Sequence, residues 1–121
     1  MRAALGIQER HVGPVTILEL SDWLVAGGGD DRYKEHVATL VRAGHLNLLV
    51  GMANVTYVDS GGVGVLVGTL LHVSRRGGRL KLLAPSARVA RVLEITGLHR
   101  VFEVFEHEED AVASFEPMAS H

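Results

Sequence analysis

The segment TYVDSGGVGVLVG, residues Thr56 to Gly68, decides how the middle of the chain folds. It starts with three residues typical of strands, Thr56–Val58, and continues through Asp59-Ser60-Gly61-Gly62. An apolar stretch from Val63 to Val73 follows. The length of this stretch and its lack of alternation favour a helix over a strand. Arg75-Arg76 suit the negative end of that helix, and Gly77-Gly78 stop it. We therefore expect Ser60 in the first turn of a helix.

The sequence before this segment predicts an α/β arrangement. VTILEL follows the turn signal Gly13-Pro14 and is typical of a strand. We expect an antiparallel partner around residues 4–11 and a third short extended piece at 23–26. Asp30 or Asp31 can cap a helix that runs to about Arg42 and ends at Gly44. One apolar stripe marks its buried face: Tyr33, Val37, Leu40 and Val41.

The remaining elements continue the alternation of strands and helices. The apolar run at 46–52 indicates a strand that is covered on both faces. Residues 79–84 predict another strand, and Pro85-Ser86 opens a helix that ends before Gly97. Residues 101–105 alternate between apolar and polar side chains, as an edge strand does, and residues 108–115 predict a last short helix. Such alternation predicts a mixed sheet in an α/β domain.

Composition and charge narrow the function classes. Of 121 residues, 47% are hydrophobic and only 5% aromatic, so Val, Leu and Ala must fill the core of one domain. We expect that domain over residues 1–121, with its core at about 4–115 and a frayed tail at 116–121. The net charge of −2 argues against binding to nucleic acid or a membrane surface, because both need a cationic excess.

The chain also lacks the signals of export and of membrane insertion. It has no cysteine, which excludes disulfides and fits a cytoplasmic location. The apolar part of the N-terminal MRAALGIQER is too short for a signal peptide. No apolar run approaches the roughly 20 residues of a membrane span. We therefore expect a soluble protein.

Ser60 has three chemical interpretations. Asp59-Ser60-Gly61-Gly62 matches the tetrapeptide around the nucleophile of trypsin-like proteases, but none of the seven histidines lies in a recognisable partner motif and no G-x-S-x-G elbow is present. An acyl-transfer enzyme is therefore rejected. Asp59 or Ser60 could be a helix N-cap, or Ser60 could accept a phosphate, which the positive helix end favours. Gly61 and Gly62 leave the hydroxyl uncovered. Spacing alone does not choose between cap and phosphate acceptor.

A family resemblance bears on that choice. The segment VDSGGVG, residues 58–64, matches the central pattern of a known family. In that pattern an apolar strand is followed by Asp-Ser, a small residue, Gly, an aliphatic residue, Gly and a helix. Downstream, a Gly-Gly, a strand, a helix that ends in TGL, the segment VFEVF and a Glu-rich helix start follow in the same order. From about Val15 to Phe115 the chain resembles the STAS domain, specifically the bacterial anti-sigma factor antagonists.

The resemblance implies a fold and a function. The fold is a mixed, mainly parallel sheet of about four to five strands, with about four helices packed largely on one face. The function is that of a binding protein without catalytic activity, which needs no cofactor and no metal. Unphosphorylated, it holds an anti-sigma factor and so frees a sigma factor for transcription. That partner is an ATP-binding serine kinase of the histidine-kinase-like fold, which phosphorylates Ser60, and a metal-dependent serine phosphatase reverses the mark.

The resemblance also places the contact surface. The first turn of the helix is the expected partner-binding site, together with the loop region after the second strand: Asp22, Asp59, Ser60, Gly61, Gly62 and Val63. Two departures from the family pattern stand out. Gly61 occupies the position of a second hydroxyl residue, and Asp22-Trp23-Leu24-Val25 replaces Gly-x-Leu-Asp.

Other features have ordinary explanations. Gly61, Gly64 and Gly68 share one helical stripe, for which we favour close packing on the sheet over the approach of a partner. The triple glycine at 27–29 lacks the Lys-Ser/Thr of a phosphate-binding loop. His99, His107 and nearby carboxylates have no helical i, i+4 histidine pair and predict no metal site. Two alternatives stay open: a non-switching STAS scaffold subunit of a signalling or lipid-transport complex, and a small nucleotide-binding protein.

Overall fold

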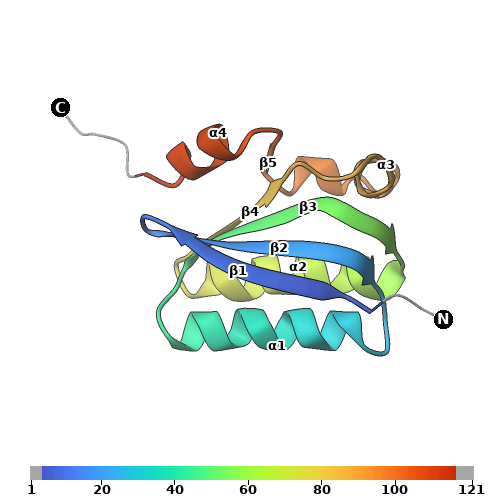
Figure 1. Ribbon diagram of the computed structural model, residues 1–121, viewed down its shortest axis with the longest axis horizontal. Coiled ribbons are helices and arrows are strands. Elements are labelled where there is room, and N and C mark those ends of the chain that lie inside the picture. The colour runs from blue at the N-terminus through green and yellow to red at the C-terminus, as the bar shows by residue number, and fades with distance from the viewer. Residues whose placement is uncertain (1–3, 117–121) are drawn as a thin grey trace.

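A computed structural model describes residues 4–116 and places a five-stranded sheet between helices (Figure 1). The strands are β1 (Gly6–Val12), β2 (Val15–Leu24), β3 (Asn47–Val58), β4 (Arg79–Leu83) and β5 (Val104–Phe105). The helices are α1 (Gly29–Arg42), α2 (Ser60–Arg75), α3 (Ala87–Thr96) and α4 (Glu108–Ala113), with a 3₁₀ turn at Leu98–Arg100. Most of the predicted tail, residues 117–121, lies outside the described range.

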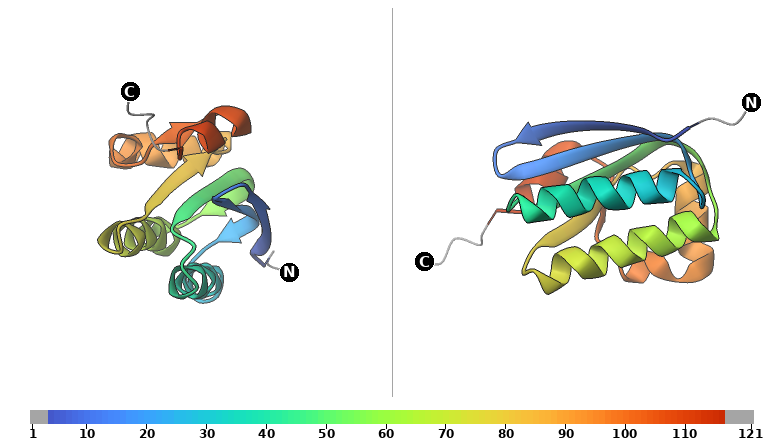
Figure 2. Two further views of the ribbon diagram at one scale, coloured as in Figure 1. Left: turned by 90° about the vertical axis from the view of Figure 1, so that its left-hand side faces the viewer. Right: turned by 90° about the horizontal axis from the view of Figure 1, so that it is seen from below.

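The strand order in the sheet is the chain order, β1-β2-β3-β4-β5. β1 and β2 are antiparallel, and the later neighbours are parallel. Crossovers between parallel strands are right-handed, so a sheet that grows in one direction receives its crossover helices on one side. Accordingly α1, α2 and α3 contribute to one core cluster, whereas α4 covers the other face (Figures 1 and 2). The predicted mixed, mainly parallel sheet is confirmed.

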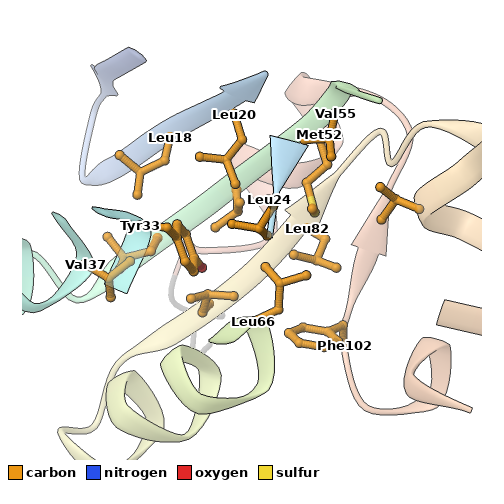
Figure 3. Close-up of a cluster of buried hydrophobic side chains, with 14 of the residues drawn as sticks. Leu18, Leu20, Leu24, Tyr33, Val37, Met52, Val55, Leu66, Leu82 and Phe102 are labelled. Carbon is orange, nitrogen blue, oxygen red and sulfur yellow. The ribbon is translucent and has the colours of Figure 1, made fainter. Parts of the chain in front are cut away.

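The first half of the central strand β3, residues 47–52, is buried on both faces, as its sequence predicted, and the strand continues six residues further than predicted, to Val58. Leu48, Val50 and Met52 point into the larger cluster, and Leu49 between them points into the smaller one beneath α4. Figure 3 shows the larger cluster, where leucines of β2 meet Tyr33 of α1 and Leu66 of α2. The Tyr33 hydroxyl is hydrogen-bonded to Thr69 Oγ1 at 2.9 Å, and burial raises the pKa of this tyrosine. α1 and α2 are thereby joined in the core.

A buried cation attaches α4 to the sheet. Lys81 on β4 is 3% exposed, and its Nζ donates to the carbonyl oxygen of Ser114 at 3.1 Å and to its Oγ at 2.9 Å. The same Nζ lies 4.6 Å from the centre of the Phe115 ring and 3.4 Å from a Glu103 carboxylate oxygen. A buried charge is tolerated when it is paired in this way.

Several local predictions need correction. Residues 23–26 are not a separate strand, because β2 continues to Leu24 through register shifts between Glu19 and Ser21 and between Asp22 and Trp23. Neither Asp30 nor Asp31 caps α1. Its N-cap is Gly28, which has no side chain, and Asp30 Oδ1 instead accepts from the N–H groups of Gly28 and Asp31. β5 comprises only two of the five predicted residues.

A small polar cluster connects β1 to α1. His36 of α1 and His11 of β1 each place Nε2 2.7 Å from a different carboxylate oxygen of Glu9. The hydrogen bond from His36, followed by that from His11, lowers the pKa of Glu9 below its usual 4.5. A carboxyl with a lowered folded-state pKa stabilises the fold above its ordinary pKa, and this contribution is lost as the pH falls through the folded value.

We therefore expect Glu9→Gln to lower the melting temperature at pH 7, and the gap to wild type to close as the pH falls below about 4.5. Thermal unfolding followed by circular dichroism between pH 3 and pH 7 measures both curves. Glu106→Gln, at an exposed position outside the helices and strands, is the matched control and should follow wild type throughout. A gap for Glu9→Gln that stays constant with pH would show that the charge of the Glu9 carboxylate does not stabilise the fold.

Candidate functional site

The candidate site lies where the parallel strands β2 and β3 end. Leu24 pairs with Val58 at this edge, so the loop after β2 and the first turn of α2 leave the sheet side by side. Loops at the carboxyl ends of parallel strands are the usual place for binding sites in α/β folds. The segment that contains Asp59 and Ser60 is thus presented at the end of the molecule where α1 and α2 both begin (Figure 2).

Asp59 is the N-cap of α2, and its side chain joins two segments. Oδ1 accepts from the backbone N–H of Gly62 at 2.9 Å. Both carboxylate oxygens also accept from the backbone N–H of Ala26, at 3.1 and 3.2 Å. The first contact satisfies a free N–H of the helix, and the second fixes the loop after β2 against it. Of the two predicted cap residues, the structure therefore assigns the cap to Asp59.

The side chain of Ser60, unlike that of Asp59, does not cap the helix. It is exposed at the first position of α2, and its hydroxyl makes no hydrogen bond to any residue between 4 and 116. The unpaired N–H groups and the helix dipole give this end of α2 a positive potential. The hydroxyl is free to react or to contact another molecule, and a negative group on it would be favoured by the helix end.

Gly61 and Gly62 are required for the close approach of α2 to the β2 loop. A Cβ on Gly61 would lie 2.6 Å from Cβ of Ala26. A Cβ on Gly62 would overlap the carbonyl oxygen of Leu24 and lie 2.7 Å from Cγ2 of Val58. The two glycines therefore let the helix that carries Ser60 start directly against the loop.

The other two predicted contact residues differ in position. Val63 is partly buried against the larger core cluster, and its N–H donates to the Asp59 carbonyl at 2.9 Å. Asp22 is exposed on β2 opposite Val55, at the same end of the sheet. Within the described residues it makes no hydrogen bond to Asp59 or Ser60, so the structure does not join it to the first turn of α2.

The backbone of Asp22 explains one departure from the family pattern. Its φ is +69°, in the left-handed region that favours glycine, and the register of β2 against β3 shifts next to it. Aspartate tolerates this conformation better than most residues do. The position that normally carries glycine thus keeps a glycine-type backbone here and adds an exposed carboxylate.

Sequence reasoning missed one member of the site, Ala26. Its contribution is a backbone N–H, which every residue except proline has, so no residue-type signal could identify it. Residues 4–116 contain no group of three His, Asp or Glu side chains placed to hold a metal ion. None of the helices in this range has the length and apolar character needed to cross a membrane.

Asp59→Ala should destabilise the fold by about 0.5–2 kcal/mol, because it removes the cap of α2 and the link to the Ala26 N–H. Ser60→Ala, the neighbouring control, should change the free energy of unfolding by less than about 0.5 kcal/mol. Urea denaturation of both variants measures the difference. Equal effects of the two substitutions would mean that Asp59 does not hold the loop.

Comparisons with known proteins find a matching family model, relatives in sequence and similar solved structures. The model of the STAS domain matches residues 7–111. An anti-sigma-B factor antagonist of Bacillus subtilis strain 168 is 37% identical over 79 residues, which cover 65% of this chain and 72% of the relative. A crystal structure from Thermotoga maritima superposes with a TM-score of 0.83 at 25% identity, over 90% of this chain and 93% of that one. The phosphorylated form of the Bacillus cell fate determinant SpoIIAA gives a TM-score of 0.73 at 21% identity, over 92% and 100%.

Proposed function

The chain belongs to the STAS domain family, and from that premise we propose that it is an anti-sigma factor antagonist switched by phosphorylation of Ser60. In its unphosphorylated form it binds an anti-sigma factor and so releases a sigma factor for transcription. That anti-sigma factor is an ATP-binding serine kinase, and its transfer of phosphate to Ser60 ends the complex. A metal-dependent serine phosphatase restores the binding form. The chain itself is a binding protein, not an enzyme.

The observation that supports this proposal best is that Asp59 is hydrogen-bonded within the fold, whereas its neighbour Ser60 is exposed. The Asp59 carboxylate is engaged by the N–H groups of Ala26 and Gly62. The Ser60 hydroxyl beside it is exposed and makes no bond within residues 4–116. A kinase can therefore modify Ser60 without breaking any contact that holds the fold. The name of the Bacillus subtilis relative and the phosphorylated form of SpoIIAA agree with this interpretation.

The transfer itself needs no catalytic group from this chain. The Ser60 oxygen attacks the γ-phosphorus of ATP, the bond from that phosphorus to the β–γ bridging oxygen breaks, and ADP leaves. The hydroxyl proton passes to a base on the kinase. Asp59 is occupied by backbone donors, so its part is to hold the first turn of α2 in place rather than to take the proton.

One phosphate can supply the loss of binding free energy that the switch requires. Weakening a nanomolar complex to micromolar takes about 4 kcal/mol. A phosphoserine carries nearly two negative charges, and burying an uncompensated charge in an interface costs several kcal/mol. An exposed Ser60 at the centre of the contact is thus sufficient for the switch, without a change of fold.

The first test is the intact mass of the protein after incubation with ATP and the serine kinase that is encoded nearest to it. Wild type should gain the mass of one phosphate, and Ser60→Ala should gain none. Because Gly61 stands where a second hydroxyl residue occurs in many relatives, a second phosphate is not expected. A wild-type protein that stays unmodified while it binds the kinase would make it a non-switching scaffold.

A further inference from the structure

A groove between α1 and α2 begins beside the candidate site and extends away from it along both helices. It has a volume of about 510 Å³ and starts at Gly61, next to Ser60. The two helices run alongside each other for most of their length (Figure 2). The groove is lined from both helices: Asp30, Asp31, Lys34 and Ala38 from α1, and Gly61, Gly64, Val65, Gly68, Thr69, His72 and Arg75 from α2.

The outward face of α2 along this groove lacks charge. Ser60, Gly64, Gly68 and Leu71 are its exposed positions before the last turn, and Leu71 is 45% exposed. Their i, i+3 and i+4 spacing puts them on one stripe. The outward face of a surface helix normally consists of charged and polar residues. An uncharged face of this kind is suited to contact with another molecule.

The internal packing of the protein does not explain Gly64 and Gly68. A Cβ built on either residue meets no atom within 4 Å, in contrast to Gly61 and Gly62. The expectation that the whole glycine stripe packs against the sheet is therefore wrong for these two positions. Alanine would form the helix better and would fit without a clash. Because these two glycines have no side chain, the backbone of another molecule can approach α2 closely at the groove.

The groove contains two cationic side chains without a partner. Lys34 and Arg75 form no ion pair with any residue in the described range 4–116, and His72 also lines the groove. Of the two acidic residues that line it, Asp30 already accepts from two backbone N–H groups. The unpaired cations therefore favour an occupant with acidic side chains.

We propose that this groove binds one amphipathic α-helix of the anti-sigma factor, an inference that rests on the proposed function. The small or apolar face of that helix lies over Gly64 and Gly68, because helices pack through rows of residues spaced by three and four. Its acidic flank faces Lys34 and Arg75. A phosphate on Ser60 stands at the mouth of the groove, where its charge repels an acidic helix.

Equilibrium binding of the full chain to its anti-sigma factor kinase tests the groove, with ADP present so that no phosphate can be transferred. Gly68→Leu, which fills the groove, and Arg75→Glu, which reverses a flanking charge, should each weaken the dissociation constant at least tenfold. Ser74→Leu, on the same helix outside the groove, and Arg91→Glu, on α3, are the matched controls and should stay within twofold. Melting temperatures confirm that all four variants are folded.

Ser60→Asp separates this inference from the proposed function. If Ser60→Asp abolishes binding while Gly68→Leu and Arg75→Glu bind as tightly as wild type, the groove proposal is wrong and the proposed function stands. If both groove variants bind weakly while Ser60→Asp binds like wild type, the groove is the docking site and the phosphorylation switch is wrong. A wild-type chain that binds no such kinase overturns both.

Discussion

The arrangement of the candidate site depends on the three hydrogen bonds that the Asp59 carboxylate accepts. Two come from the Ala26 N–H in the loop after β2, and one comes from the Gly62 N–H in the first turn of α2. The parallel pairing of β2 and β3 brings these segments together, and the Asp59 side chain links them. Gly61 and Gly62 make the contact close enough, because a side chain at either position would strike the loop.

This constraint gives two adjacent residues different positions in the structure. Asp59 accepts from two backbone N–H groups and caps α2, whereas the Ser60 hydroxyl makes no hydrogen bond within residues 4–116. Under the proposed function, a phosphate on Ser60 therefore breaks no hydrogen bond of the described fold and acts on the partner that docks there. The groove along α1 and α2 extends from the serine toward Arg75.

Much of the fold was predictable because burial leaves periodic patterns. Tyr33, Val37, Leu40 and Val41 mark the inner face of α1, and the continuous apolar run around Val50 marks a strand with two covered faces. Other features leave no such pattern. The outer half of β3 contains the exposed residues Ala53 and Asn54, so it did not resemble a buried strand. The cap of α1 is a glycine that offers no side chain to recognise.

The candidate site was predictable only in part, for a similar reason. Asp59 and Ser60 are visible as residue types, and their place before an apolar helix indicated a cap or a phosphate acceptor. The partner of Asp59 is the backbone of Ala26, which has no signature in a sequence. The open side of Gly64 and Gly68 also required the relative placement of two helices, since the same glycines in close packing would give the same sequence.

The most direct test of the central claim compares the affinity of one anti-sigma factor for the unphosphorylated chain and for the chain phosphorylated at Ser60, by titration calorimetry. We expect a loss of about a thousandfold, or about 4 kcal/mol. We also expect the amide chemical-shift changes in the phosphorylated chain to stay confined to the β2 loop and the first turns of α1 and α2. Equal affinities of the two forms, or shifts that spread through the whole sheet, would show that Ser60 is not the switch.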